Sequence, residues 1–229
     1  MKYLRVVVAF LLLPVAAAVA WSFGDLLIKL GAYVSTASLP FWLGLASYFL
    51  FQIVFFRPVR TYVFGHELTH ALVGVLSGAR LKSFKVTSSG GSVVLTKNTL
   101  WIALAPYFVP VYTLLLVGAY RIGCRVWPLD AYYPYFLFAA GFSLSFHFAL
   151  THFAVAQGQS DLKQFGTFFS GVVIVLISCP LMAGLLKLIF PQFVSCKGFL
   201  YGAYHDAVLI FRVVFNKGYQ LCIFFRSMK

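Results

Sequence analysis

Apolar runs long enough to cross a bilayer recur along this chain, and they constrain its fold more than any other feature. The first extends from about Leu4 to Phe23. A helix of about 20 residues, rising about 1.5 Å per residue, spans a hydrocarbon core of roughly 30 Å. Hydrophobic residues make up 62% of the chain and charged residues only 10%, too few to cover a soluble domain. We therefore predict an all-α polytopic membrane protein whose solvent is the lipid bilayer.

We predict about six transmembrane helices in a single membrane-embedded domain covering residues 1–229. Arg80–Asn98 interrupts the apolar pattern, because it is rich in β-branched residues and carries Ser88-Ser89-Gly90-Gly91 at its middle. This composition predicts a short β-hairpin between the third and fourth spans. The predicted spans are Leu4–Phe23, Leu39–Phe56, Val59–Ser77, Leu100–Arg121 with kinks at Pro106 and Pro110, Tyr132–Ala156 and Phe165–Phe190.

The two ends of the chain each fit more than one interpretation. Lys2 and Arg5, followed by an apolar run and Ala18-Val19-Ala20, fit either a signal anchor over residues 1–23 or a cleaved signal peptide. The tail, residues 191–229, mixes basic and aromatic side chains. For this tail we expect an interfacial helix rather than a further crossing.

The net charge of +13 would suggest nucleic-acid binding in a soluble protein. Here most basic residues flank apolar runs, as Arg57, Arg60, Arg121 and Arg125 do, where they meet lipid headgroups. We therefore expect no nucleic-acid partner. The 4 cysteines are far apart and form no C-x-x-C pair, which argues against a disulfide framework or a thiolate metal site.

The third predicted span carries an H-E-x-x-H motif at His66, Glu67 and His70. Histidines at i and i+4 lie one turn apart on one helix face, so both imidazoles can bind one metal ion. Glu67, the only glutamate of the chain, is placed to take a proton from a water activated by that metal. The motif predicts Zn²⁺ with His66 and His70 as ligands and Glu67 as the catalytic base. The alternative is a buried polar network that fastens helices together.

The sequence Gly-His-Glu-Leu-Thr-His-Ala at 65–71, inside an apolar span and followed by a hairpin and further spans, resembles the site-2 protease group of intramembrane zinc metallopeptidases. The resemblance covers roughly residues 57–170. It implies a zinc-dependent endopeptidase that hydrolyses peptide bonds of membrane-spanning protein or peptide substrates. It also implies a third zinc ligand, an aspartate from a later helix, and a bacterial inner or plasma membrane as the location.

Asp161 is the best candidate for the third metal ligand. The usual third-ligand motif of the family is absent, and Gln159-Ser160-Asp161-Leu162 resembles the more divergent bacterial members. Asp161 lies at a polar break between two apolar runs, where Gly158 lets the backbone open. An ordinary helix N-cap is the alternative role for this aspartate. His147 and His152 are rival partners of the metal, although their spacing of five places them on different helix faces.

The predicted hairpin has a substrate-binding role if it lies beside the metal. An edge strand can pair with a substrate helix that has unwound and hold its backbone extended. Phe84, Val86, Val93 and Leu95 would then bind the substrate or pack beneath it. The alternative is a surface loop whose lysines bind headgroups.

Two other functions fit the same residues. One is a catalytically silent, metal-binding membrane scaffold, and the other is an ion or proton transporter. The membrane orientation has conflicting indications: the Lys and Arg distribution over six spans favours cytoplasmic termini, whereas the resemblance favours a hairpin near the cytosol.

Overall fold

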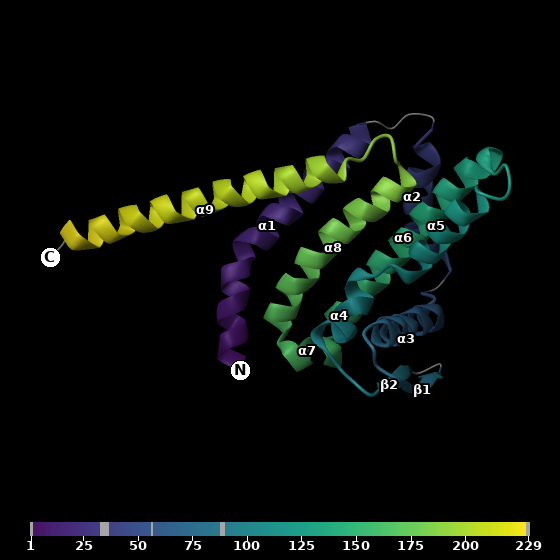
Figure 1. Ribbon diagram of the computed structural model, residues 1–229, viewed down its shortest axis with the longest axis horizontal. Coiled ribbons are helices and arrows are strands. Elements are labelled where there is room, and N and C mark those ends of the chain that lie inside the picture. The colour runs from purple at the N-terminus through teal and green to yellow at the C-terminus, as the bar shows by residue number, and fades with distance from the viewer. Residues whose placement is uncertain (1, 33–36, 56, 88–89, 228–229) are drawn as a thin grey trace. The chain divides into compact units, whose positions relative to one another are not determined.

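The computed structural model describes residues 2–32, 37–55, 57–87 and 90–227. It confirms a mainly helical chain with one β-hairpin (Figure 1). The chain divides into two compact units, one formed by Met1–Gly31 with Gly171–Lys229 and the other by Ala32–Ser170. The elements are α1 (Lys2–Ala32), α2 (Leu39–Val54), α3 (Val59–Leu76), β1 (Leu81–Val86), β2 (Gly91–Leu95), α4 (Leu100–Phe108), α5 (Val111–Gly123), the 3-10 turn η1 (Asp130–Tyr132), α6 (Tyr133–Ala156), α7 (Ser160–Phe165), α8 (Thr167–Ile189) and α9 (Cys196–Ser227).

Helices α1, α6, α8 and α9 are long and apolar enough to cross a membrane, so the chain has the helices of a multi-pass membrane protein. Helices α4 and α5 make a fifth crossing if they form one broken span, bent by 72°. The bend lies at Pro110, which has no backbone N–H to continue the helix. The predicted count of six is not confirmed. Helix α2 has only 16 residues, and α3, which carries the polar motif, is not among the helices that are long and apolar enough to cross.

Helices α2 and α6 pack backbone to backbone in the unit formed by Ala32–Ser170. Two glycines allow this approach. A Cβ atom at Gly44 would collide with the carbonyl oxygen of Phe138, and one at Gly141 would collide with that of Phe41. Small residues at helix contacts commonly serve this purpose in membrane proteins. The contact fixes α6, which leads directly into the short helix α7.

Helices α2 and α6 run in the same direction. The Ser145 hydroxyl donates a hydrogen bond to the Leu45 carbonyl oxygen at 2.9 Å, midway along both helices. Just beyond the end of α2, the Arg57 guanidinium lies 5.0 Å from the centre of the Phe153 ring near the end of α6. The starts of α3 and α7 therefore lie at the same end of this unit.

The hairpin lies along helix α3. Strands β1 and β2 pair antiparallel, which confirms the predicted hairpin, and Phe84 lies opposite Val93. Ser88 and Ser89 of the expected turn lie outside the described residues. The Phe84 ring meets the Phe64 ring of α3 edge-on at 5.9 Å. A Cβ atom at Gly74 of α3 would lie 2.6 Å from Leu95 Cδ1. Helix α3 is thus flanked by a sheet over much of its length.

In the other unit, helices α1, α8 and α9 share a small apolar core. Cys179, Ala183 and Phe199 are buried there, with Val19 and Phe23 packed against them. Helix α1 continues to Ala32, beyond the predicted end at Phe23. Helix α9 meets the length and composition criterion for a span, although we predicted an interfacial tail. Signal-peptide cleavage and the interfacial position of the tail stay predictions.

Candidate metal centre

Helix α3 places both histidines and the glutamate of the motif beside one another. The ring centres of His66 and His70 are 4.8 Å apart, as expected for positions one helical turn apart. His66 and Glu67 are buried, with exposed fractions of 7% and 9%. The hydroxyl of Thr69, within the same motif, donates to the Gly65 carbonyl oxygen at 2.7 Å. This bond satisfies the buried hydroxyl and leaves the histidines as the polar groups available on this face.

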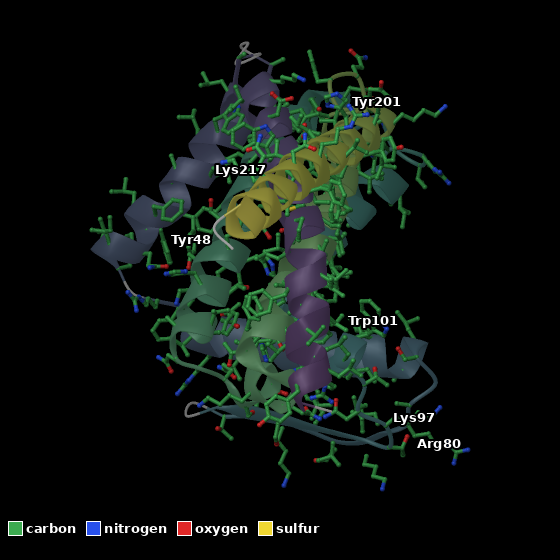
Figure 2. The ribbon with its side chains drawn as sticks, turned by 90° about the vertical axis from the view of Figure 1, so that its left-hand side faces the viewer. Tyr48, Arg80, Lys97, Trp101, Tyr201 and Lys217 are labelled. Carbon is green, nitrogen blue, oxygen red and sulfur yellow. The ribbon has the colours of Figure 1, made fainter. Side chains whose placement is uncertain are left out.

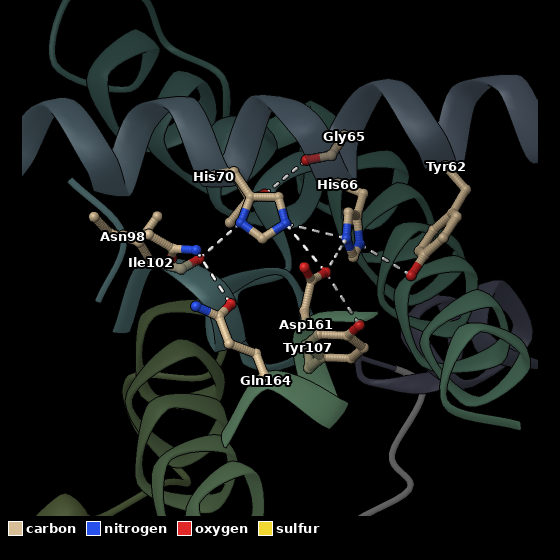
Figure 3. Close-up of polar contacts among 10 residues, drawn as sticks. Tyr62, Gly65, His66, His70, Asn98, Ile102, Tyr107, Asp161 and Gln164 are labelled. Atoms are coloured by element: carbon tan, nitrogen blue, oxygen red, sulfur yellow. Dashed lines mark hydrogen bonds and ion pairs between the residues drawn. The ribbon is translucent and has the colours of Figure 1, made fainter. Parts of the chain in front are cut away.

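Asp161 joins the two histidines, as the sequence predicted. Gly158 has a φ of +65°, which lets the chain turn after α6 and begin α7 at Ser160. The Oδ2 atom of Asp161 then lies 3.3 Å from His66 Nε2 and 3.5 Å from His70 Nε2 (Figure 3). The N-cap role is wrong, because the N-cap residue of α7 is Gln159. Asp161 lies within the first turn of the helix.

The spacing of the three ligand atoms fits a small divalent ion. The third distance, between the Nε2 atoms of His66 and His70, is 3.2 Å. Tetrahedral zinc with bonds of about 2.0–2.1 Å separates its ligand atoms by about 3.3–3.4 Å. Two imidazole nitrogens and one carboxylate oxygen are also a donor set that zinc commonly takes. The group His66, His70 and Asp161 can therefore hold a metal ion.

Hydrogen bonds on the far side of each imidazole orient the ligand nitrogens. His70 Nδ1 lies 2.7 Å from the Ile102 carbonyl oxygen, which can only accept, so Nδ1 carries the proton and Nε2 is free to bind a metal. His66 Nδ1 lies 3.2 Å from the hydroxyl oxygen of Tyr62. Such outer partners fix the tautomer and ring orientation of metal-binding histidines.

Asp161 is held ionised by its neighbours. Burial raises the pKa of this carboxyl, but protons on His66 Nε2 and His70 Nε2, the positions that a metal ion would otherwise take, hydrogen-bond to it and hold its pKa well below its usual range. The Tyr107 hydroxyl also donates to Asp161 Oδ2, at 3.4 Å. An ionised carboxylate is the form that binds a metal.

A cleft of about 420 Å³ opens onto the ligand group and Glu67. Strand β2 forms one wall, and the starts of α4 and α7 form others. Gly91 touches Glu67: a Cβ atom at residue 91 would lie 2.5 Å from Glu67 Cγ. The cleft thus brings the predicted base, the ligands and a strand edge together. Its lining residues are His66, Glu67, His70, Gly91–Leu95, Lys97, Asn98, Ile102, Ala103, Gln159, Ser160 and Asp161.

The outer edge of β2 carries the backbone groups that β1 does not bind. At the two ends of the hairpin, Thr87 N–H donates to the Gly90 carbonyl oxygen and Thr96 N–H donates to that of Arg80. Hydrogen-bonded pairs alternate along an antiparallel ladder. The N–H and C=O groups of Gly91, Val93 and Leu95 therefore point away from β1, along the edge that borders the cleft.

The four predicted substrate-binding residues divide into two groups. Val93 and Leu95 line the cleft, whereas Phe84 and Val86 belong to β1 and do not. All four side chains share the sheet face that packs on α3, since Val86 pairs with Gly91 and Phe84 with Val93. Any pairing with a substrate would therefore use the backbone of β2 rather than these side chains.

The rival histidines do not join the ligand group. His147 is buried and shares with His66 a separate cavity of about 20 Å³, and His152 is exposed. Among the residues that the structure describes, one group of His, Cys or acidic side chains lies close enough together to hold a metal ion. It consists of His66, His70 and Asp161.

Comparison with known protein families, curated proteins and solved structures finds no match for this chain. The functional argument therefore depends on the geometry of the site. Sequence reasoning missed Tyr62 and Tyr107 as partners of the ligands. Tyr62 precedes His66 by four residues and could have been found from helical spacing, whereas no local signal marks Tyr107, which approaches from another helix.

Proposed function

We propose that this chain is a zinc-dependent intramembrane endopeptidase of the site-2 protease-like group. The observation that carries the proposal is the convergence of His66 Nε2, His70 Nε2 and Asp161 Oδ2 at mutual distances of 3.2–3.5 Å beside a buried glutamate. Two further features support it: the cleft that exposes these groups, and the presence in the same chain of helices long and apolar enough to cross a membrane. We assign the protein to a bacterial inner or plasma membrane on the strength of the sequence resemblance.

A bound zinc ion would supply Lewis-acid activation of a water molecule and of the scissile carbonyl group. Glu67 accepts the proton of the attacking water, whose oxygen forms a bond to the carbonyl carbon. As the C–N bond breaks, Glu67 returns that proton to the leaving amine nitrogen. Contact with Gly91 limits the positions that the Glu67 side chain can adopt.

The substrate we propose is a membrane-spanning segment that has unwound near the cleft. Hydrolysis needs an accessible carbonyl, and the carbonyl groups of a helix are bound within it. The free backbone groups of Gly91, Val93 and Leu95 can replace those lost hydrogen bonds by adding the substrate as a strand beside β2. Such a strand would run past Glu67, because Gly91 contacts that residue.

Cleavage of a membrane helix by purified wild type and Glu67→Gln tests this function. Glutamine keeps the shape of the side chain but cannot accept the proton, so we expect the rate to fall by about 10²–10⁴-fold with the zinc content unchanged. Asp130→Asn removes a different carboxylate, in the turn η1, and should leave the rate unchanged. A metal-loaded wild type that cleaves no membrane helix would indicate a silent scaffold instead.

A further inference from the structure

Basic residues in the unit formed by Ala32–Ser170 gather at one end. Of its nine Lys and Arg residues, Arg121 and Arg125 lie at the end of α5, away from the cleft. The other seven lie in or next to α3, the hairpin and α7. We call these seven residues the basic end. These are Arg57, Arg60, Arg80, Lys82, Lys85, Lys97 and Lys163.

The hairpin presents its cations away from α3. Lys85 lies opposite Ser92, on the sheet face that does not pack on the helix. Lys82 is the extra residue of the irregular pairing between Leu81 and Ser83. Thr96 N–H donates to the Arg80 carbonyl oxygen at 3.0 Å, and this pairing brings Arg80 and Lys97 to the open end of the hairpin (Figure 2).

This charge is not neutralised within the unit. All seven side chains of the basic end are exposed. None of the seven forms an ion pair with an acidic residue in the described part of the chain. The nearby acids, Glu67 and Asp161, are turned into the cleft. The basic end is therefore an exposed cationic surface.

Exposed Trp and Tyr side chains lie near both ends of this unit. Trp101, four residues after Lys97, has 53% of its surface exposed. At the other end of the unit, Trp127 and Tyr132 are 62% and 60% exposed. Exposed Trp and Tyr side chains at both ends of a bundle are typical of the two membrane–water interfaces.

We propose that the basic end binds anionic lipid headgroups, and that the mouth of the cleft consequently lies at a layer of charged headgroups. The cations come from the α2–α3 connection, α3, the hairpin and α7, so they form a broad surface that matches a charged leaflet better than a single acidic peptide. Clusters of Lys and Arg at a membrane surface are attracted to anionic lipid headgroups. Because Lys97 also lines the cleft, bound headgroups lie at its mouth.

Native mass spectrometry of the full chain, purified in micelles containing equal phosphatidylglycerol and phosphatidylcholine, tests this proposal. We expect the wild type to retain phosphatidylglycerol in preference to phosphatidylcholine. The double variant Lys82→Gln, Lys85→Gln should lower that preference at least fivefold. One cation near a charged membrane surface contributes about 1 kcal/mol, which corresponds to about a fivefold change in binding. The pair Lys82→Arg and Lys85→Arg, which changes the same two side chains but keeps their charge, should keep the preference within about twofold.

Three results would overturn the proposal. The wild type could retain both lipids equally, or both double variants could lower the preference to the same extent. The hairpin variant could also keep its lipid preference yet lose affinity for an acidic peptide, which would identify a protein partner. Since no cleavage is measured, the result does not depend on the proposed peptidase function.

Discussion

The backbone of Gly91 is in close contact with the side chain of Glu67. A Cβ atom at residue 91 would lie 2.5 Å from Glu67 Cγ and 2.9 Å from Glu67 Oε1, closer than side chains tolerate. The first residue of β2 is thus part of the wall around the proposed base. The hairpin and the catalytic motif are consequently coupled through one glycine.

Replacing Gly91 with valine should impair cleavage without removing the metal. The new side chain must displace either Glu67 or the hairpin edge, and a shift of about 1 Å at a catalytic group can cost on the order of 10²-fold in rate. Ser83→Val, in β1 outside the cleft, is the matched control and should cleave normally. Equal cleavage by Gly91→Val and wild type would show that the contact is unimportant.

Replacing Tyr62 with phenylalanine should weaken zinc binding by about 10- to 100-fold, the usual cost of losing an outer partner of a ligand. The reason is that His66 Nδ1 loses the hydroxyl oxygen 3.2 Å away that orients its ring. Competition with a chelator of known affinity measures the change. Tyr135→Phe, at an exposed tyrosine distant from the site, is the control, and equal affinities in the two variants would refute the role of Tyr62.

His152→Ala should keep both zinc and activity within about twofold, because an exposed side chain outside the ligand group contributes little to metal binding. Metal content and cleavage rate are measured on the same preparation. A metal-free His152→Ala protein would mean that this histidine, and not Asp161, completes the site.

Gly141→Val should destabilise the fold by about 3 kcal/mol or more, since its side chain would collide with the α2 backbone, which cannot move aside as a side chain can. Gly118→Val is the control, because nothing lies within 4 Å of a Cβ atom at that helical glycine. Thermal unfolding in detergent distinguishes the two. A Gly141→Val protein as stable as Gly118→Val would contradict the close packing of α2 on α6.

Sequence alone predicted the features that depend on local spacing or on rare residues. The motif at His66–His70 needs only the period of a helix, and Asp161 stood out because carboxylates are costly in apolar surroundings. The hairpin followed from its composition. What the sequence could not predict depends on three-dimensional packing: the 72° bend between α4 and α5, the sheet lying along α3, and the contact between Gly91 and Glu67.

Zinc content of the purified wild type and Asp161→Ala, determined side by side, tests the central claim most directly. We expect about one zinc per chain in the wild type, as for a site with three protein ligands, and at least a tenfold loss of affinity when the carboxylate is removed. His205→Ala, outside the site, should remain loaded. A wild type without zinc, or an Asp161→Ala protein that stays fully loaded, would contradict the metal centre proposed for this chain.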